Sequence, residues 1–338
     1  MSITVDALRK TFGDHVALDS ISFQVPQGAF FCVVGPSGCG KSTLLRAVAG
    51  LETPETGRIS LDDRVMFGDR INVPPEDRQV GVVFQSYALW PHLTVAQNVA
   101  FPYEANGTPR AEALKKAGQH LGTVALESFA DRKPDALSGG QRQRVALARC
   151  LAGGARTILM DEPLANLDPH LRHAMEGELR AFHDRSGVTT LFITHDQREA
   201  MALADIMAVM DHGRLMQVGT PQDIYERPAN EMVAGFVGRG AVLSAQVDGG
   251  VAQIAGQSVP VSGSRTGLCQ ILIRPKQVTL DPDGIQAQIT TSTYRGGHWE
   301  VGATAPNGVF QLVFDLPHPA RVGDHVGIRL TGGWILPG

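Results

Sequence analysis

A glycine-rich stretch of nine residues carries the most specific chemical pattern in the sequence. It consists of Gly35, Pro36, Ser37, Gly38, Cys39, Gly40, Lys41, Ser42 and Thr43. Because glycine has no Cβ, backbone N–H groups at such a turn can close around phosphate oxygens. Lys41 would supply a charge for the outer phosphates, and the Ser42 hydroxyl would bind Mg²⁺. The stretch, called the phosphate loop below, therefore predicts a nucleotide-binding protein.

The segments on both sides of the phosphate loop must hold it in place. An uninterrupted apolar run over residues 29–34 predicts a buried strand, and residues 44–49 predict a helix. The unpaired N–H groups and partial positive charge at that helix start favour phosphate binding. A glycine-rich turn without a ligand is the alternative, and the order strand, turn, helix disfavours it.

Two adjacent carboxylates follow a second apolar run. Residues 157–160 predict a buried parallel strand, and Asp161 and Glu162 stand at its end. Ligands of open α/β sheets bind at the carboxyl ends of the strands. Asp161 is suited to hold Mg²⁺ through water and Glu162 to polarise an attacking water. An ordinary capped loop is the alternative, and the apolar run before the pair disfavours it.

A second helix start suited to anions occurs at Leu137-Ser138-Gly139-Gly140-Gln141, called the pentad below. Ser138 and Gln141 have the spacing of a capping box, and the two glycines leave N–H groups exposed. The pentad downstream of a phosphate loop resembles the nucleotide-binding subunits of ABC transporters. The resemblance is strong over residues 1 to about 238 and weaker over the remainder of the chain.

This resemblance implies an α/β P-loop ATPase cassette over residues 1–238, with a helical subdomain over about 88–155. It implies that Phe12 stacks on adenine, although a single Phe near a turn more often packs in a core. Residues 80–84 predict a short buried strand, and Gln85 is the first polar residue after it. The resemblance gives Gln85 a role at the metal and the attacking water, where the residue pattern alone would allow a surface glutamine. Asp168 would cross to a partner protomer, and His195 would sense the terminal phosphate, although a histidine at a strand end is more often structural.

The resemblance also implies the partners. Each ATP would lie between the phosphate loop of one protomer and Ser138, Gly139, Gly140 and Gln141 of its partner, in a head-to-tail dimer of the chain. The aromatic stretch over residues 87–93, called the docking loop below, is expected to be exposed, which predicts a protein contact. The resemblance assigns this contact to the transmembrane permease. A periplasmic or surface solute-binding protein would act on the chain indirectly.

Short alternating segments with glycine, proline and aspartate turns fill residues 239–338. Strands are expected over 242–247, 270–275, 286–289 and 309–313, which predicts a small all-β, OB-like barrel. This part resembles the regulatory C-terminal domain of importer ATPases. Residues 240–338 contain six basic and six acidic residues and few aromatic residues, which argues against nucleic acid as a partner. His298, His318 and His325 lack metal-ligand spacing and are expected at the surface.

Composition and the position of the cysteines predict the compartment. The chain has a net charge of −4 and four cysteines without a C-x-x-C pair, which fits a reducing cytosol. The sequence shows no signal-peptide pattern and no apolar run long enough to span a membrane. The expected location is therefore the cytoplasmic face of the bacterial inner membrane, with the pore formed by another chain.

Two other classes of protein are disfavoured. A soluble ABC ATPase acting on DNA or ribosomes usually has two cassettes or a long coiled-coil insertion, whereas this chain has one cassette and no such insertion. The pentad and Gln85 argue against a P-loop kinase or GTPase. Among importers, residues 236–240 and 273–277 look most like the ferric-iron branch. The polyamine, sulfate or thiosulfate, molybdate and sugar branches share nearly all the catalytic motifs and are the alternatives.

Overall fold

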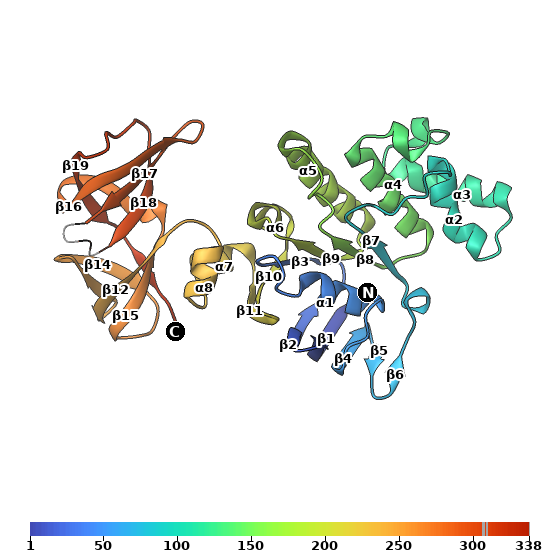
Figure 1. The fold of residues 1–338 in the computed structure, drawn as a ribbon, viewed down its shortest axis with the longest axis horizontal. Coiled ribbons are helices and arrows are strands. Elements are labelled where there is room, and N and C mark those ends of the chain that lie inside the picture. The colour runs from blue at the N-terminus through green and yellow to red at the C-terminus, as the bar shows by residue number, and fades with distance from the viewer. Residues whose placement is uncertain (306–307, 309, 338) are drawn as a thin grey trace. The chain divides into compact units, whose positions relative to one another are not determined.

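A computed structural model describes residues 1–305, 308 and 310–337 (Figure 1). The chain divides into two compact units, Met1–Pro221 and Gln222–Gly338. This division falls earlier than the expected boundary between residues 238 and 239. The helices α7 (Pro221–Glu226) and α8 (Glu231–Phe236) lie almost entirely in the second unit.

These two helices go with the second unit because one buried arginine binds them to its strands. The guanidinium of Arg274 donates hydrogen bonds to the backbone carbonyls of Tyr225, Ala234 and Arg239. The indole N–H of Trp334 donates to the carbonyl of Pro228 at 3.0 Å. Such side-chain contacts across more than thirty residues are not visible in local sequence patterns.

The first unit begins with an antiparallel sheet in the order β2-β1-β4-β5-β6. Buried and exposed residues alternate over 21–25, as a strand with one solvated face requires. The strands are β1 (Ile3–Phe12), β2 (His15–Val25), β4 (Thr56–Leu61), β5 (Arg64–Gly68) and β6 (Ile71–Asn72).

A second sheet carries the residues expected to do chemistry. Its order is β11-β10-β3-β9-β8-β7, and all neighbours are parallel except β10 and β11. The inner strands β3, β8 and β9 are buried along their whole length, as continuous apolar runs predict. The strands are β3 (Phe30–Val34), β7 (Val80–Val83), β8 (Thr157–Asp161), β9 (Thr189–Thr194), β10 (Ile206–Asp211) and β11 (Arg214–Gly219).

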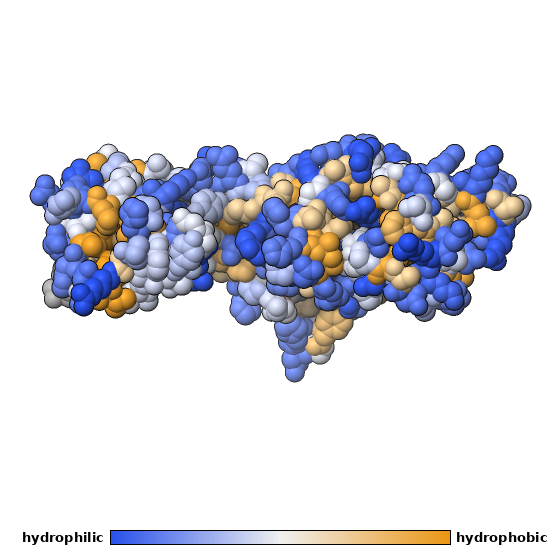
Figure 2. All heavy atoms as spheres, turned by 90° about the horizontal axis from the view of Figure 1, so that it is seen from above, coloured by the Kyte–Doolittle hydropathy of each residue, from blue (hydrophilic) through white to orange (hydrophobic). Residues whose placement is uncertain are grey.

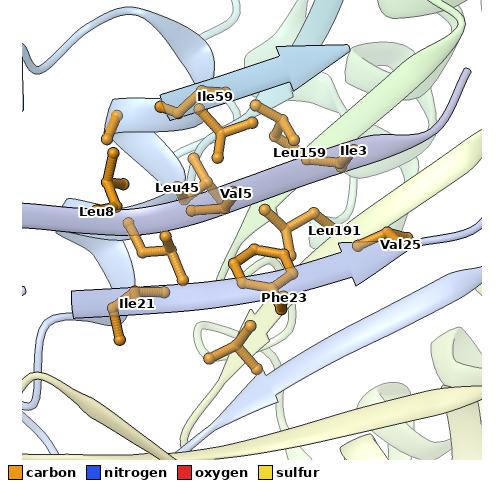
Figure 3. Close-up of a cluster of buried hydrophobic side chains, with 14 of the residues drawn as sticks. Ile3, Val5, Leu8, Ile21, Phe23, Val25, Leu45, Ile59, Leu159 and Leu191 are labelled. Carbon is orange, nitrogen blue, oxygen red and sulfur yellow. The ribbon is translucent and has the colours of Figure 1, made fainter. Parts of the chain in front are cut away.

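The strand β7 differs from the buried strand expected over residues 80–84. It lies at the edge of the sheet, so Val80 and Val82 are only partly covered. The hydrophobic core lies where the helix α1 and the two sheets meet. Figure 3 shows Leu45 of α1 beside Val5 and Ile59 of the antiparallel sheet, with Leu159 and Leu191 of the parallel sheet nearby. Full burial of each such side chain contributes about 1.5–3 kcal/mol.

The helices of the first unit cover the parallel sheet or form a separate group. The helices α2, α3 and α4 pack against one another (Figure 1), where the helical subdomain was expected. The helices are α1 (Lys41–Ala49), α2 (Val95–Ala105), α3 (Arg110–Thr123), α4 (Gly139–Ala152), α5 (Pro169–Ser186) and α6 (Gln197–Leu203).

The second unit confirms the prediction of a small β-barrel. Five strands close a barrel in the order β12-β13-β14-β20-β15, and four more form a sheet in the order β18-β17-β16-β19. Both share one apolar core, which includes Ile271 and Phe314. The strands are β12 (Ala241–Asp248), β13 (Val251–Ile254), β14 (Gln257–Ser262), β15 (Gly267–Ile273), β16 (Val278–Tyr294), β17 (Trp299–Thr304), β18 (Gln311–Leu316), β19 (His325–Leu330) and β20 (Gly333–Ile335).

Three sequence predictions bear on the surface of this unit. The strand expected over residues 309–313 begins at Gln311, and Val309 lies outside the described residues. His318 and His325 are exposed, as expected, and the partly exposed His298 faces Asp315 at 3.6 Å. Figure 2 shows a face on which apolar residues form groups among hydrophilic ones. Among the described helices, none is both long and apolar enough to cross a membrane.

Candidate functional site

The phosphate loop joins β3 to α1, the context that the sequence predicts. Gly38 and Gly40 have φ values of 81° and 104°, which only glycine adopts readily. A Cβ on Gly40 would lie 2.1 Å from the carbonyl oxygen of Ala17, and one on Gly35 would lie 2.0 Å from that of Met210. Both positions therefore exclude any side chain, and the loop is fixed against its neighbours by close backbone contact.

The lysine of the loop is held inside it. The Lys41 ammonium donates to the carbonyl of Gly35 at 2.9 Å and to that of Pro36 at 2.8 Å, and the side chain is buried. It also lies 3.7 Å from the Cys39 Sγ. Burial raises the pKa of the Cys39 thiol, and the nearby Lys41 lowers it in part. The fold thus holds the positive charge of the Lys41 ammonium inside the phosphate loop.

The two residues predicted to bind Mg²⁺ from the loop and from β8 touch one another. The Ser42 hydroxyl donates to the Asp161 carboxylate at 2.8 Å, although the two residues are 119 positions apart. Asp161 is the last residue of the buried strand β8 and is itself buried. The parallel sheet therefore brings a hydroxyl oxygen and a carboxylate oxygen together beside the phosphate loop.

The next residue along the chain is paired with the predicted phosphate sensor. A Glu162 carboxylate oxygen lies 3.1 Å from the Nδ1 atom of His195. Glu162 has a φ of 46°, a conformation that costs a residue with a Cβ about 1–3 kcal/mol. Its N–H donates to the carbonyl of Ile193 at 3.0 Å, so β9 holds both members of the pair. Strain of this kind gathers at functional sites.

An open cleft of about 240 Å³ borders Lys41, Ser42 and Glu162, while Asp161 and His195 are not among its lining residues. It is lined by Phe12, His15, Ala17, Ser37, Gly38, Gly40, Lys41, Ser42, Thr43 and Glu162. The Phe12 side chain is 49% exposed, so this ring is not a core residue, and the Lys10 ammonium lies 4.9 Å from its centroid. The cleft thus joins an exposed aromatic ring, an anion-binding loop and a carboxylate.

The pentad begins α4 as predicted, and both halves of the capping box form between Ser138 and Gln141. The two glycines of the pentad pack closely against other side chains of the same unit. A Cβ on Gly139 would lie 2.5 Å from the Leu167 side chain, and one on Gly140 would lie 2.6 Å from the Met175 side chain. The described lining of the 240 Å³ cleft includes none of the four predicted pentad residues.

Asp168 and Gln85 lie at the ends of loops. The Asp168 carboxylate caps α5 by accepting from the N–H of Leu171 at 3.0 Å. Gln85 is exposed just beyond β7. Its backbone carbonyl accepts a hydrogen bond from the Asn166 side-chain amide at 3.1 Å. The structure thus connects the segment 165–168 to Gln85, a contact that sequence reasoning missed.

The docking loop corrects one expectation, since it is only partly exposed. Tyr87 is buried, and its hydroxyl donates to the carbonyl of Pro163 at 3.2 Å. Trp90 packs against Phe101 with 4.1 Å between ring centroids, and the Arg149 guanidinium lies 4.9 Å from the Trp90 ring. Phe101, which is 40% exposed, extends the apolar surface onto α2.

Comparison with known proteins covers both units. A family model described as ABC transporter matches residues 18–165, and one described as TOBE domain matches residues 271–336. The Fe(3+) ions import ATP-binding protein FbpC of Brucella abortus (strain 2308) is 40% identical over 322 residues, which cover 92% of this chain and 90% of that protein. The chain belongs to the ATP-binding subunits of ABC transporters. As a member of this family it binds ATP and is an ATPase.

Relatives with other named solutes are about equally similar to this ABC subunit. The spermidine/putrescine import ATP-binding protein PotA of Acidothermus cellulolyticus is 44% identical, covering 82% of this chain and 75% of its own. The sulfate/thiosulfate import ATP-binding protein CysA of Caulobacter vibrioides is 39% identical and covers 91% of both chains. The identities alone therefore do not separate the solutes.

Solved structures match the ATP-binding part of this ABC subunit. The dimeric post-hydrolysis cassette MJ0796 bound to ADP and Pi superimposes with a TM-score of 0.56 at 30% identity, covering 65% of this chain and 98% of that one. The cbiO1 protein of Clostridium perfringens, part of the cbiONQ complex, gives 0.60 at 29% identity, covering 66% and 89%. They bear out the predicted P-loop ATPase fold.

Proposed function

We propose that this chain is the ATP-hydrolysing subunit of a binding-protein-dependent importer of ferric iron. One observation carries the hydrolytic part: the Ser42–Asp161 and Glu162–His195 contacts lie beside one phosphate loop. Three groups needed for phosphoryl transfer are thereby combined: a cation for the phosphates, oxygen ligands for a metal and a base for water.

The residues divide the reaction among themselves. Lys41 and the N–H groups of residues 35–43 bind the phosphates, and Phe12 stacks on the adenine. Glu162 accepts a proton from the attacking water, and His195 holds Glu162 and contacts the terminal phosphate. Gln85, exposed at the end of β7, approaches the metal and the water. A positioned general base of this kind contributes about 10²–10⁴-fold to the rate.

The oxygen atoms near the loop fit Mg²⁺. Ser42 and Asp161 offer a hydroxyl and a carboxylate, and Gln85 adds an amide oxygen; these are the hard ligands that Mg²⁺ takes together with substrate phosphates. Bound there, Mg²⁺ neutralises the charge that develops on the phosphates. Among the described residues, no cluster of three or more His, Cys, Asp or Glu could hold a metal alone, which suits an ion shared with the nucleotide.

The active form is a head-to-tail dimer. The pentad offers an exposed Ser138 and helix N–H groups, yet none of its four predicted ligand residues lines the cleft with Lys41. A phosphate held by Lys41 of a partner protomer would give these groups a ligand. Asp168 stands at the start of α5, next to Leu167, whose side chain packs against Gly139 of the pentad. Binding of ATP closes the dimer, and loss of the terminal phosphate reopens it.

We infer ferric iron as the solute because residues 236–240 and 273–277 look most like the ferric-iron branch and relatives named for Fe(3+) import match through both units. The Brucella protein named for Fe(3+) import covers 92% of the chain, through both units. Iron would pass through the permease as cargo. The same ATPase role in polyamine, sulfate or thiosulfate, molybdate or sugar import is the alternative, and sequences named for polyamine and sulfate import match nearly as well.

The docking loop supports a permease partner and a place on the cytoplasmic face of the membrane. Trp90 and Phe101 form a partly exposed apolar surface with Arg149 beside it. Exposed aromatic residues next to an arginine are typical of protein interfaces. The barrel of the second unit would serve as the regulatory domain.

Reconstitution tests this proposal. The chain, its permease and a purified iron-binding protein in proteoliposomes should hydrolyse ATP faster when the binding protein carries ferric iron. Replacing Trp90 and Leu93 by alanine should abolish the stimulation and leave basal hydrolysis nearly unchanged, because neither residue lines the cleft with Lys41.

The control variant for that experiment is Leu51→Ala. Leu51 is an exposed apolar residue outside the docking loop, 48% accessible, so its removal tests apolar surface in general. Stimulation by a polyamine- or sulfate-loaded binding protein instead would contradict iron as the solute. Retained stimulation in the Trp90 and Leu93 variant would contradict the docking surface.

A further inference from the structure

Arg172 contacts two loops of the ATPase unit at once. It lies in the second turn of α5, and its guanidinium donates to the Leu167 carbonyl at 3.2 Å. On its other side it lies 3.6 Å from a carboxylate oxygen of Asp196 and 3.6 Å from one of Glu199. The carbonyl belongs to the segment before α5, and the two carboxylates, which are ion-pair partners of Arg172, belong to the start of α6.

The two carboxylates fix the backbone on either side of His195. The Glu199 carboxylate accepts from the Thr194 hydroxyl at 2.5 Å, and the same hydroxyl accepts from the N–H of Asp196 at 3.0 Å. Asp196 caps α6. His195 therefore stands between two residues whose positions depend on the carboxylates that Arg172 faces.

Charge makes this arrangement costly to break. Glu199 is buried at 3% exposure, and burial raises the pKa of its carboxyl group. A buried carboxylate that loses its cation is strongly destabilised. A guanidinium reaches several acceptors in fixed directions, which a lysine ammonium does not.

The Leu167 end of the contact leads to the pentad. The Leu167 side chain lies beside Gly139, where an added Cβ would be 2.5 Å from it. The backbone carbonyl of the same leucine accepts the hydrogen bond from Arg172. A shift of the pentad on meeting a second protomer would therefore move Leu167 and strain its bond to Arg172. The path from there runs through Asp196 and Glu199 to His195 and Glu162.

We propose that Arg172 is a positioning residue that links the pentad and Leu167 to the His195–Glu162 pair. Closure of the dimer at the pentad then aligns the pair for hydrolysis, and neither ATP binding nor proton transfer uses Arg172 directly. This inference rests on the proposed function, in which the sites are shared between protomers.

The test compares Arg172→Met with Arg198→Met in the full-length chain. Arg198 also pairs with Asp196, at 3.1 Å, but its side chain is 81% exposed and extends into solvent. Arg172→Met should lower kcat about 2- to 30-fold, the range found for coupling residues. It should also lower the Hill coefficient for ATP and change the ATP Kd of the monomer by less than about twofold. Arg198→Met should have the kcat, the Hill coefficient and the ATP Kd of the parent.

A purely structural role for Arg172 gives a different pattern. The melting temperature should fall in either case, because Glu199 loses its cation. A fall in ATP affinity in step with turnover would overturn the proposal, as would a parental kcat and Hill coefficient in Arg172→Met. Should Arg172→Met fold poorly, Arg172→Lys keeps one charge but cannot reach the Leu167 carbonyl and both carboxylates together. An intermediate kcat with parental ATP affinity is then expected. A parental kcat and Hill coefficient in Arg172→Lys would overturn the proposal.

The proposed function fails separately. Parental turnover in Glu162→Gln would remove the hydrolytic assignment whatever Arg172 does. An inactive Glu162→Gln variant together with a parental Arg172→Met variant would remove only the bridging role.

Discussion

Glu162→Gln should bind ATP with parental affinity and turn it over about 10²–10⁴-fold more slowly, because the amide cannot accept the proton of the attacking water. The substitution keeps the size of the side chain and a polar group within reach of His195, which lies 3.1 Å away in the parent. The backbone strain at φ 46° is unchanged. The variant should also accumulate as a closed dimer with ATP. Single-turnover kinetics measure the rate of hydrolysis, and light scattering measures the ATP-dependent dimerisation.

The matched control for this variant is Glu112→Gln. Glu112 is an exposed carboxylate on α3 that pairs with Lys116, and the same chemical change there should leave turnover at the parental rate. Hydrolysis at the parental rate in Glu162→Gln, or a variant that stays monomeric with ATP, would show that Glu162 is not the base.

Lys41→Ala should abolish tight ATP binding. The Lys41 ammonium is the charge that the fold holds inside the phosphate loop, at 2.9 Å and 2.8 Å from two loop carbonyls. Each charge-assisted hydrogen bond lost costs about 1.5–3 kcal/mol, which raises Kd about 10- to 150-fold. Equilibrium binding of a fluorescent ATP analogue measures the change.

Loss of Lys41 also removes two bonds within the loop, so the fold of the variant must be checked. Circular dichroism should show parental secondary structure, since β3 and α1 are held by buried apolar residues. Lys116→Ala, which removes an exposed lysine from α3, is the control and should leave ATP affinity unchanged. Parental ATP affinity in Lys41→Ala would contradict the phosphate-loop assignment.

The local features of the site could be predicted from sequence because they depend on neighbouring residues. The capping box at Ser138 forms as the S-x-x-Q spacing predicts. Gly40 adopts the left-handed conformation that a phosphate loop requires. The continuous apolar runs at β3 and β8 indicated buried strands, as the structure has them.

Contacts between distant residues were not predictable in the same way. Nothing local to Arg172 shows that its side chain meets both Leu167 and the loop after β9. Burial of Tyr87 depends on the carbonyl of Pro163, 76 positions later, and the earlier division between the units depends on Arg274. Such pairings follow from the packing of whole elements, which propensity and spacing do not encode.

The central claim, that each ATP is held by two protomers, is tested most directly by mixing Lys41→Ala with Gly139→Asp. Each variant alone should be inactive, the second because a carboxylate beside the terminal phosphate repels it. The nearest atom to a Cβ at Gly139 is a terminal carbon of Leu167, and Leu167 can move to make room, so the variant should fold.

A mixed dimer of these variants has one site with both defects and one with neither. Activity should therefore return on mixing and reach about a quarter of the parental rate at a 1:1 ratio, when random pairing makes half of the dimers mixed and each intact site turns over independently. A rate that equals the sum of the two separate variants at every ratio would contradict sites shared between protomers.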